Sequence, residues 1–498
     1  MKSYSSILAL LLLSTPLVVA TKTLAIEEIP PNIHRRLLWQ DAYPFKNLGL
    51  TLNNSKRVLA KDGESKVAID SDEAAFYYRR GKEYDKQGKL ELAFADYNRA
   101  IQLDPEYADA YLNRGVIHAK QKRSKLALAD YDRAIQLDSE HPDAYYYRGF
   151  LYSAQGKLEL ALSDYNQAIE INPEDYESYY YRGFIYSSQG EIESALDDYD
   201  RVIQLKPEYA RAYNSRGVLY AEQGKLELAL ADFNQAVKLA PEYADPYSNL
   251  GFFYIRKGKL ELALANYNRA IEINPQDYRA YNNRGLIYAR QGKEELALAD
   301  YNKAIELNPK YINAYYNRGK LYGAQRKFKL ALADYNRTIE INPEYTNAYF
   351  GRGAVYARQG QAELALANYS QAIQLNPEFV NAYFNRGFIY AKQGQTELAL
   401  TDFDRVIEIN PEDSEAYYHR GLVYQQQEEL ELALSDYESA IEINPKFAKA
   451  YGNLGFIHMK QGNTEEARFN LQKAKQLFEA QGKSADVQKA ASFLQQLK

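Results

Sequence analysis

The sequence has no cysteine and only one tryptophan, two methionines and five histidines among its 498 residues. Without cysteine the chain forms no disulfide and offers no thiol nucleophile and no thiolate ligand for zinc. The sequence therefore does not indicate whether the protein's compartment is oxidising or reducing. The histidines are scattered, and no HExxH metal motif, glycine-rich phosphate loop or nucleophile elbow occurs. We therefore expect neither an enzyme nor a bound cofactor or metal.

An excess of one charge is also missing. The 61 basic and 66 acidic side chains give a net charge of −5, and both signs are mixed along the chain. A nucleic-acid-binding surface needs a concentrated basic face. We therefore do not expect nucleic acid as a partner.

Long apolar runs are confined to residues 1–25, MKSYSSILALLLLSTPLVVATKTLA. The basic Lys2, the apolar run and the small residues that follow are typical of a signal peptide, cleaved after Ala20 or after Ala25. The alternative is an uncleaved membrane anchor, but Pro16 interrupts a run shorter than the roughly 20 residues that a spanning helix needs. We expect export to a periplasm, an envelope surface or the medium, with no membrane span in the mature chain.

Residues 26–73 have no periodicity and combine scattered prolines with a polar stretch. Such a composition is typical of a partly disordered linker. The one tryptophan, Trp39, lies here, and we expect it to be an apolar anchor on the array that follows.

What the sequence does contain is a period of 34 residues. Glycine recurs at 81, 115, 149, 183, 217, 251, 285, 319, 353, 387, 421 and 455, with no insertion. We number repeat positions from Ala74, which puts this glycine at position 8 and defines twelve repeats over 74–481. Such a period is a better guide to architecture than chain length.

Each repeat predicts two helices. In one copy, Tyr278–Gln291 has its larger side chains three to four residues apart, and Gly292 suits the left-handed position that ends a helix. Three repeats replace this glycine, with Lys122, Arg326 and Glu428. The second helix begins with acidic residues and ends at Asn308, because proline follows. Neither helix is long enough to be stable alone, so each pair must pack on its neighbours.

The repeated residues of this copy are Tyr281, Gly285, Tyr288, Ala297, Tyr301, Ala304 and Pro309. Their pattern resembles the tetratricopeptide repeat (TPR), whose period is also 34 residues. The resemblance implies an all-α fold, a right-handed α-solenoid superhelix of helix pairs whose first helices line a concave groove. Residues 482–498 predict a capping helix, with Ser484 as its N-cap and one apolar stripe formed by Val487, Ala490, Ala491, Leu494 and Leu497.

Tyrosine is abundant, with 47 residues, of which 31 stand at positions 4, 11 and 24. These positions recur at helical spacing on the predicted buried face, so we assign them to core packing rather than to an aromatic ligand stripe. Glycine at position 8 and alanine at position 20 would let the two helices approach closely.

Positions 7 and 23 vary together. Position 7 is arginine in ten repeats, and the exceptions are Leu250 and Leu454. Position 23 is aspartate in nine, and both leucine repeats have asparagine there. This predicts an ion pair between the two helices of one repeat, such as Arg284 with Asp300. Arg352, which faces Asn368, is the exception, and full solvation of both groups is the alternative.

Positions that differ between repeats are the candidate partner-binding residues. Asparagine at position 6 resembles the asparagine ladder in the TPR region of the O-linked N-acetylglucosamine transferase, where amides hold a peptide backbone. Positions 5 and 9 add aromatics and position 13 adds cations. The alternatives are solvated groove residues and packing between repeats. The candidates are Asn249, Asn283, Asn317, Asn385, Tyr316, Phe350, Phe384, Phe388, Arg290, Arg358 and Lys392.

These patterns favour a non-enzymatic scaffold that binds a partner protein or an extended peptide in the groove. No repeat has the asparagine and lysine combination of the chaperone-type carboxylate clamp, so a chaperone-tail receptor is excluded. The alternatives are an assembly component of a cell envelope, working through lateral or end-to-end contacts, and the substrate-docking arm of an enzyme acting in trans. The oligomeric state is left open.

Overall fold

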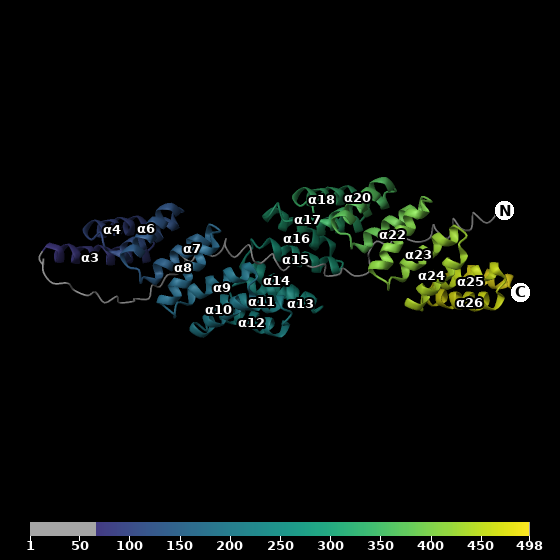
Figure 1. The fold of residues 1–498 in the computed structure, drawn as a ribbon, viewed down its shortest axis with the longest axis horizontal. Helices are drawn as coiled ribbons and strands as arrows, with labels where there is room; N and C mark the ends of the chain where they lie inside the picture. The colour runs from purple at the N-terminus through teal and green to yellow at the C-terminus, as the bar shows by residue number, and fades with distance from the viewer. Residues whose placement is uncertain (1–65, 498) are drawn as a thin grey trace. The chain divides into compact units, whose positions relative to one another are not determined.

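The computed structural model describes residues 66–497, which form 25 helices and no strand (Figure 1). The expected signal peptide, Trp39 and most of the expected linker lie outside this range. The described chain divides after Pro275 into two compact units, which we call the N-terminal unit and the C-terminal unit.

The N-terminal unit holds the first six repeats. Its helices are α3 (Lys66–Lys86), α4 (Leu90–Leu103), α5 (Ala108–Lys120), α6 (Ser124–Leu137), α7 (Pro142–Ala154), α8 (Leu158–Ile171), α9 (Tyr176–Gln189), α10 (Ile192–Leu205), α11 (Ala210–Glu222), α12 (Leu226–Leu239), α13 (Ala244–Arg256) and α14 (Leu260–Ile273).

The C-terminal unit holds the other six repeats and one further helix. Its helices are α15 (Tyr278–Arg290), α16 (Glu294–Leu307), α17 (Ile312–Ala324), α18 (Phe328–Ile341), α19 (Thr346–Arg358), α20 (Ala362–Leu375), α21 (Val380–Lys392), α22 (Thr396–Ile409), α23 (Ser414–Gln426), α24 (Leu430–Ile443), α25 (Ala448–Gln461), α26 (Thr464–Ala480) and α27 (Ser484–Gln496).

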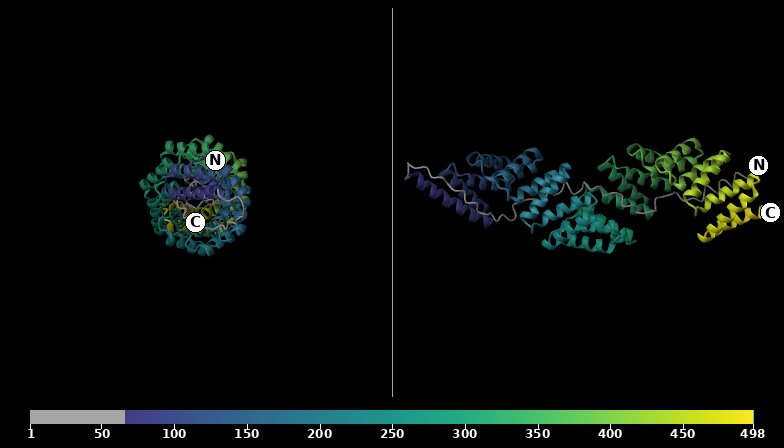
Figure 2. Two further views of the ribbon diagram at one scale, coloured as in Figure 1. Left: turned by 90° about the vertical axis from the view of Figure 1, so that its left-hand side faces the viewer. Right: turned by 60° about the horizontal axis from the view of Figure 1, so that its bottom comes forward.

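Helix pairs stack side by side within each unit (Figure 2). The two helices of a repeat pack on each other, and the second helix packs on the first helix of the next repeat. First helices of neighbouring repeats also touch one another, as α5 touches α7 and α15 touches α17. The first helices therefore lie on the inner side of each stack, which we call the groove side. The all-α solenoid prediction is confirmed.

The array begins earlier than the period indicates. Helix α3 starts at Lys66, whereas the first repeat was expected to start at Ala74. Residues 66–73 contain neither proline nor glycine, so nothing in them stops the first helix from extending toward the N-terminus.

The helix ends follow the chemistry that the sequence predicts. Helix α15 ends at Arg290, and Gly292 adopts a left-handed φ of 71°. The amides of Gly292 and Lys293 donate back to the carbonyls of Ala289 and Tyr288 at 3.1 and 2.9 Å. These bonds satisfy carbonyls at the helix end that have no partner within the helix.

The three repeats without this glycine adopt the same left-handed backbone. Lys122, Arg326 and Glu428 have φ values of 59°, 57° and 65°. A side chain in this conformation costs about 1–2 kcal/mol. Glycine avoids this cost, but part of the resulting stabilisation is offset because glycine has more conformational freedom in the unfolded chain.

Replacing Lys122, Arg326 or Glu428 by glycine is therefore expected to stabilise the array by about 0.5–1 kcal/mol per site. Chemical denaturation followed by circular dichroism measures the change. The matched control is Gly292→Lys, which should destabilise by a similar amount. Glycine variants no more stable than the parent chain would show that these turns carry no strain.

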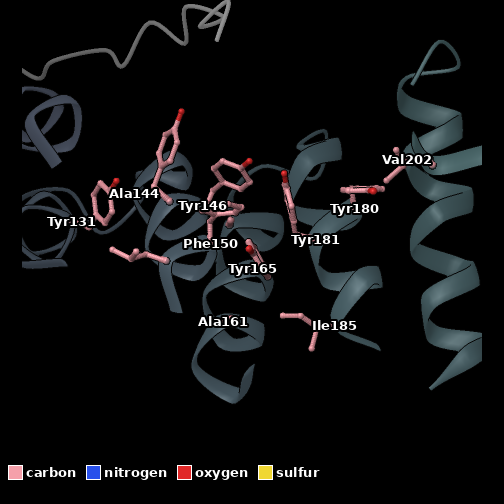
Figure 3. Close-up of a cluster of buried hydrophobic side chains, with 14 of the residues drawn as sticks. Tyr131, Ala144, Tyr146, Phe150, Ala161, Tyr165, Tyr180, Tyr181, Ile185 and Val202 are labelled. Carbon is pink, nitrogen blue, oxygen red and sulfur yellow. The ribbon is translucent and has the colours of Figure 1, made fainter. Parts of the chain in front are cut away.

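The core runs along position 24 of the repeats. Its aromatic rings, and Leu471 in the last repeat, are only 0–3% exposed. In the N-terminal unit, Tyr165 packs against Tyr146 and Tyr181, with each pair of ring centroids 6.2 Å apart (Figure 3). Core packing is thus confirmed for position 24. The tyrosines at positions 4 and 11 are only half-buried.

Glycine at position 8 is required by this packing. A Cβ atom at Gly285 would lie 2.9 Å from Cε1 of Tyr301 and 3.2 Å from the carbonyl oxygen of Ala297. Both distances are shorter than normal contacts, so the two helices of the repeat meet where only glycine fits.

The last helix, α27, covers the end of the stack by packing on α26. Ala490 is buried, and the other members of the predicted stripe are half-buried. The predicted N-cap is wrong: Ser484 is already helical, and the residue before it, Lys483, makes no capping hydrogen bond with its side chain.

Candidate functional site

The arginine at position 7 joins the two helices of its own repeat. In nine repeats its Nε and Nη2 donate to the carboxylate at position 23, as Arg284 does to Asp300 at 2.8 and 2.7 Å. The predicted ion pair is confirmed. The nine pairs are Arg80–Asp96, Arg114–Asp130, Arg148–Asp164, Arg182–Asp198, Arg216–Asp232, Arg284–Asp300, Arg318–Asp334, Arg386–Asp402 and Arg420–Asp436.

The same guanidinium also reaches the preceding repeat. Nη1 of Arg216 donates to Asp200 at 2.6 Å, and Nη1 of Arg386 donates to the hydroxyl of Ser370 at 3.0 Å. These acceptors stand at position 25, which was not among the positions predicted to pair. Their signal was present, since position 25 carries a side-chain oxygen in every repeat.

The aspartates of these pairs lie in a poorly solvated layer between the helices. Burial raises the pKa of the Asp402 carboxyl, and the hydrogen bond from Arg386 opposes that rise. The same hydrogen bond is the main cause of the raised pKa of the arginine. Because the carboxylate depends on its partner for solvation, loss of the arginine alone would leave a buried charge.

The asparagines at position 6 face the neighbouring repeat more than the solvent. Nδ2 of Asn249 donates to Oδ1 of Asn214 at 2.8 Å, and Nδ2 of Asn317 donates to Oδ1 of Asn282 at 3.1 Å. In both cases the acceptor stands at position 5 of the preceding repeat. These amides therefore link repeats, which removes donors that a bound peptide would need.

Burial separates the candidate asparagines into two groups. Asn249 and Asn385 are 6% and 2% exposed, so the structure places them inside the repeat stack. Asn283 and Asn317 are half-buried. The expected asparagine ladder is thus interrupted in the sequence, and two of its four candidate members are buried.

The candidate aromatics belong to the packing between helices. Tyr316, Phe384 and Phe388 are 8%, 6% and 3% exposed, and Phe350 is half-buried. Phe384 lies against Phe403, the ring at position 24 of its own repeat, with centroids 5.7 Å apart. For these three rings the structure bears out the alternative of packing, because position 5 points toward the core ring and position 9 toward the next repeat.

One histidine completes this packing. His419 stands at position 6, and its ring lies 5.3 Å from Phe384 and 5.4 Å from Phe388 between centroids. Burial lowers the pKa of His419 to about 3. Its imidazole is therefore neutral at physiological pH and acts as a packing group.

Two of the three candidate cations of the C-terminal unit are exposed to solvent. Arg358 and Lys392 are exposed, and Arg290 is half-buried. Nη1 of Arg358 donates to the carbonyl of Gly323 on α17 at 3.0 Å, so its charge is held over the neighbouring first helix. Nζ of Lys392 lies 4.6 Å from the ring centroid of Phe388, which supports an ammonium through a cation–π contact. Position 2 is asparagine in the repeats around them, at Asn313, Asn347 and Asn381.

The N-terminal unit has acidic residues at position 2 of three successive repeats. Position 2 is acidic at Asp109, Asp143 and Glu177. Burial, with Asp175 and Asp143 nearby, raises the pKa of Glu177 to about 7. His141 balances part of this charge, with Nε2 lying 3.3 Å from Oδ1 of Asp109. These acidic residues were not among the predicted site residues, although position 2 shows them in three successive repeats.

No group of three histidine, aspartate or glutamate side chains suited to a metal ion occurs within residues 66–497. In the same range, every helix is too short or too polar to cross a bilayer.

Several solved structures resemble this chain. YrrB, described as a TPR protein with an unusual peptide-binding site, is 30% identical over 39% of this chain and 97% of its own, with a TM-score of 0.33. Yeast Tom70 is 17% identical over 79% of this chain and 96% of its own, with a TM-score of 0.37. A TPR protein from Parabacteroides merdae is 24% identical over 50% of this chain and 98% of its own, with a TM-score of 0.40. No curated protein sequence matches.

Family profiles match most of the array. A profile described as TPR repeat matches residues 81–122, 185–224, 217–258, 253–292, 355–394 and 389–428. Two profiles described as tetratricopeptide repeat match residues 108–141, 142–175, 278–311, 312–345 and 414–447, and residues 164–197 and 436–469. Together these matches cover more than half of the chain, in phase with the 34-residue period. The chain belongs to the tetratricopeptide-repeat family.

Proposed function

We propose that the chain is a non-enzymatic scaffold that binds an extended, acidic segment of a partner protein on the groove side of its C-terminal unit. The repeat family supports a protein–protein interaction scaffold. The observation that carries the finer proposal is the pair of exposed cations, Arg358 and Lys392, on the first helices α19 and α21.

Charge complementarity supports an acidic occupant. Arg358 and Lys392 stand at the same position of adjacent repeats. Their positive charges therefore recur along the groove side, where they can contact acidic side chains that recur along an extended peptide. Asn283 adds a half-buried amide that can donate to a peptide backbone. Exposed charges of this kind chiefly set the association rate and the choice of partner. The buried aromatics Tyr316, Phe384 and Phe388 then hold the shape of this surface without touching the partner.

Charge reversal tests this proposal. The double variant Arg358→Glu/Lys392→Glu should reduce partner crosslinks in the native compartment about tenfold, as judged by mass spectrometry, and should not lower thermal stability. The matched control is Lys303→Glu/Arg337→Glu, which reverses two charges on the second helices α16 and α18 and should keep the crosslinks. Recovery of self-crosslinks alone, or equal losses in both variants, would contradict the proposal.

An assembly role is the second candidate, and one observation favours it. Position 19 is leucine in ten repeats, and these side chains on the second helices are 45–51% exposed. Large exposed apolar surfaces often mark contacts between proteins. If copies assemble through this row, Leu296→Gln/Leu330→Gln/Leu364→Gln should lower the mass measured by analytical ultracentrifugation. A monomeric parent chain would exclude this role.

Export is proposed from residues 1–25, which match a signal peptide in charge, apolar run and small residues. Cell fractionation and sequencing of the mature N-terminus should find an exported chain beginning at Thr21 or Ile26. A cytosolic chain that keeps Met1 would overturn this proposal.

A further inference from the structure

The last repeat lacks both rings of a pair that other repeats share. In repeat eleven, Tyr418 at position 5 packs against Tyr437 at position 24, with centroids 5.8 Å apart. In repeat twelve these positions hold Gly452 and Leu471. The space that the ring at position 5 fills in repeat eleven therefore has no aromatic side chain in repeat twelve.

A pocket occupies that space, between the last repeat and α27. The space open to the centre of a water-sized sphere is about 60 Å³, and the wider hollow, which includes open solvent, is about 580 Å³. Phe456, Phe478 and Phe493 form its apolar walls. A Cβ atom at Gly452 would meet only Ala474 Cβ at 3.9 Å and Phe478 Cε2 at 4.0 Å, which are ordinary contacts. The glycine is thus not required by close packing, unlike the glycine at position 8.

Two cations line the pocket from different helices. Lys449 lies on α25 and Lys489 on α27, and Asp486 on α27 is the carboxylate among the lining residues. Burial lowers the pKa of both lysines, and Asp486 opposes the shift in each case. Glu415 and Lys483 also act on Lys449, so three lysines stand against two carboxylates and leave one positive charge that an anionic ligand would neutralise.

We propose that this pocket binds a small aromatic carboxylate, with its ring beside Gly452 against the phenylalanine walls and its carboxylate at Lys449 and Lys489. The ring would take the place of the missing side chain at position 5. Two sources offer this chemistry, a free aromatic acid and the C-terminal aromatic residue of a peptide. The site is separate from the proposed peptide surface, so either one can fail without the other.

Titration of the full chain with 3-phenylpropionate, followed by ligand-observed NMR, tests the proposal. The acid should bind at least about tenfold more tightly than 3-phenylpropanamide, which has the same ring without the charge. Gly452→Phe supplies the missing ring and should abolish binding while keeping or raising thermal stability. Lys449→Gln/Lys489→Gln removes only the charges and should reduce the acid to the affinity of the amide.

Peptides distinguish the two sources. A peptide that ends in a free phenylalanine is compared with 3-phenylpropionate and with the same peptide carrying a C-terminal amide. Tighter binding of the free-ended peptide would assign the pocket to peptide ends, and tighter binding of the small acid would assign it to a free metabolite. Equal binding of acid and amide, or binding that both the Gly452 and the lysine variants leave unchanged, would overturn the proposal.

Discussion

Replacing Arg284 by leucine is expected to destabilise the C-terminal unit by about 3 kcal/mol, because a charge would remain buried without its partner. Asp300 is 5% exposed and takes two hydrogen bonds from Arg284. Unfolding in denaturant, followed by circular dichroism, measures the loss. Hydrogen exchange of α15 and α16 shows whether it is local, since repeat arrays need not unfold in one step.

The chain itself supplies the matched control. Leu250 and Leu454 replace the arginine in two repeats, each with asparagine at position 23. In both, the asparagine donates to its own helix, as Asn266 does to the carbonyl of Leu262 at 2.8 Å. Adding Asp300→Asn to Arg284→Leu should therefore recover most of the lost stability. A double variant as unstable as the single one would contradict the stated role of the pair.

Asp300→Asn alone should cost less than about 1.5 kcal/mol, since it exchanges a charged acceptor for a neutral one. Repeat nine already shows this pairing, with Arg352 donating from Nε to Oδ1 of Asn368 at 2.7 Å. If the pair is buried, Arg284→Leu should be the least stable of the three variants. Two solvated charges would give all three variants similar stability.

Truncation of a core ring is expected to have an effect of similar size. Tyr301→Ala should destabilise the C-terminal unit by about 3–5 kcal/mol, because it opens a cavity at a side chain that is 1% exposed. Thermal unfolding of the chain measures the loss. The matched control is Tyr301→Phe, since phenylalanine serves at the same position in Phe233 and Phe403. A loss below about 1 kcal/mol for the alanine variant would show that position 24 is not the core.

The period made most of the fold predictable. Residues that recur in all or most copies, such as Gly285 and Tyr301, were assigned to packing because their spacing places them on one helical face. The pair of Arg284 with Asp300 followed from its matched absence in other repeats. Helix ends followed from the local chemistry of Gly292 and Pro309, which does not depend on distant contacts.

The candidate site was less predictable because it depends on how one repeat sits on the next. The bond from Asn249 to Asn214 joins residues 35 apart, and the period alone does not show which side of a first helix faces its neighbour. For the same reason the sequence left open whether Phe384 and Phe388 face the groove or pack between repeats, and the structure places them in the packing. The pocket beside Gly452 arises where repetition ends, so a pattern drawn from the other copies could not reveal it.

The most direct measurement of where partners bind uses a photo-crosslinking residue at two places of one repeat. Lys392 is exposed on the first helix α21, and Leu398 is 48% exposed on the second helix α22. With the residue introduced at 392 or at 398, irradiation in the native compartment should give partner adducts from 392 and none from 398. Adducts from 398 alone would contradict binding on the groove side and would favour assembly through the leucine row.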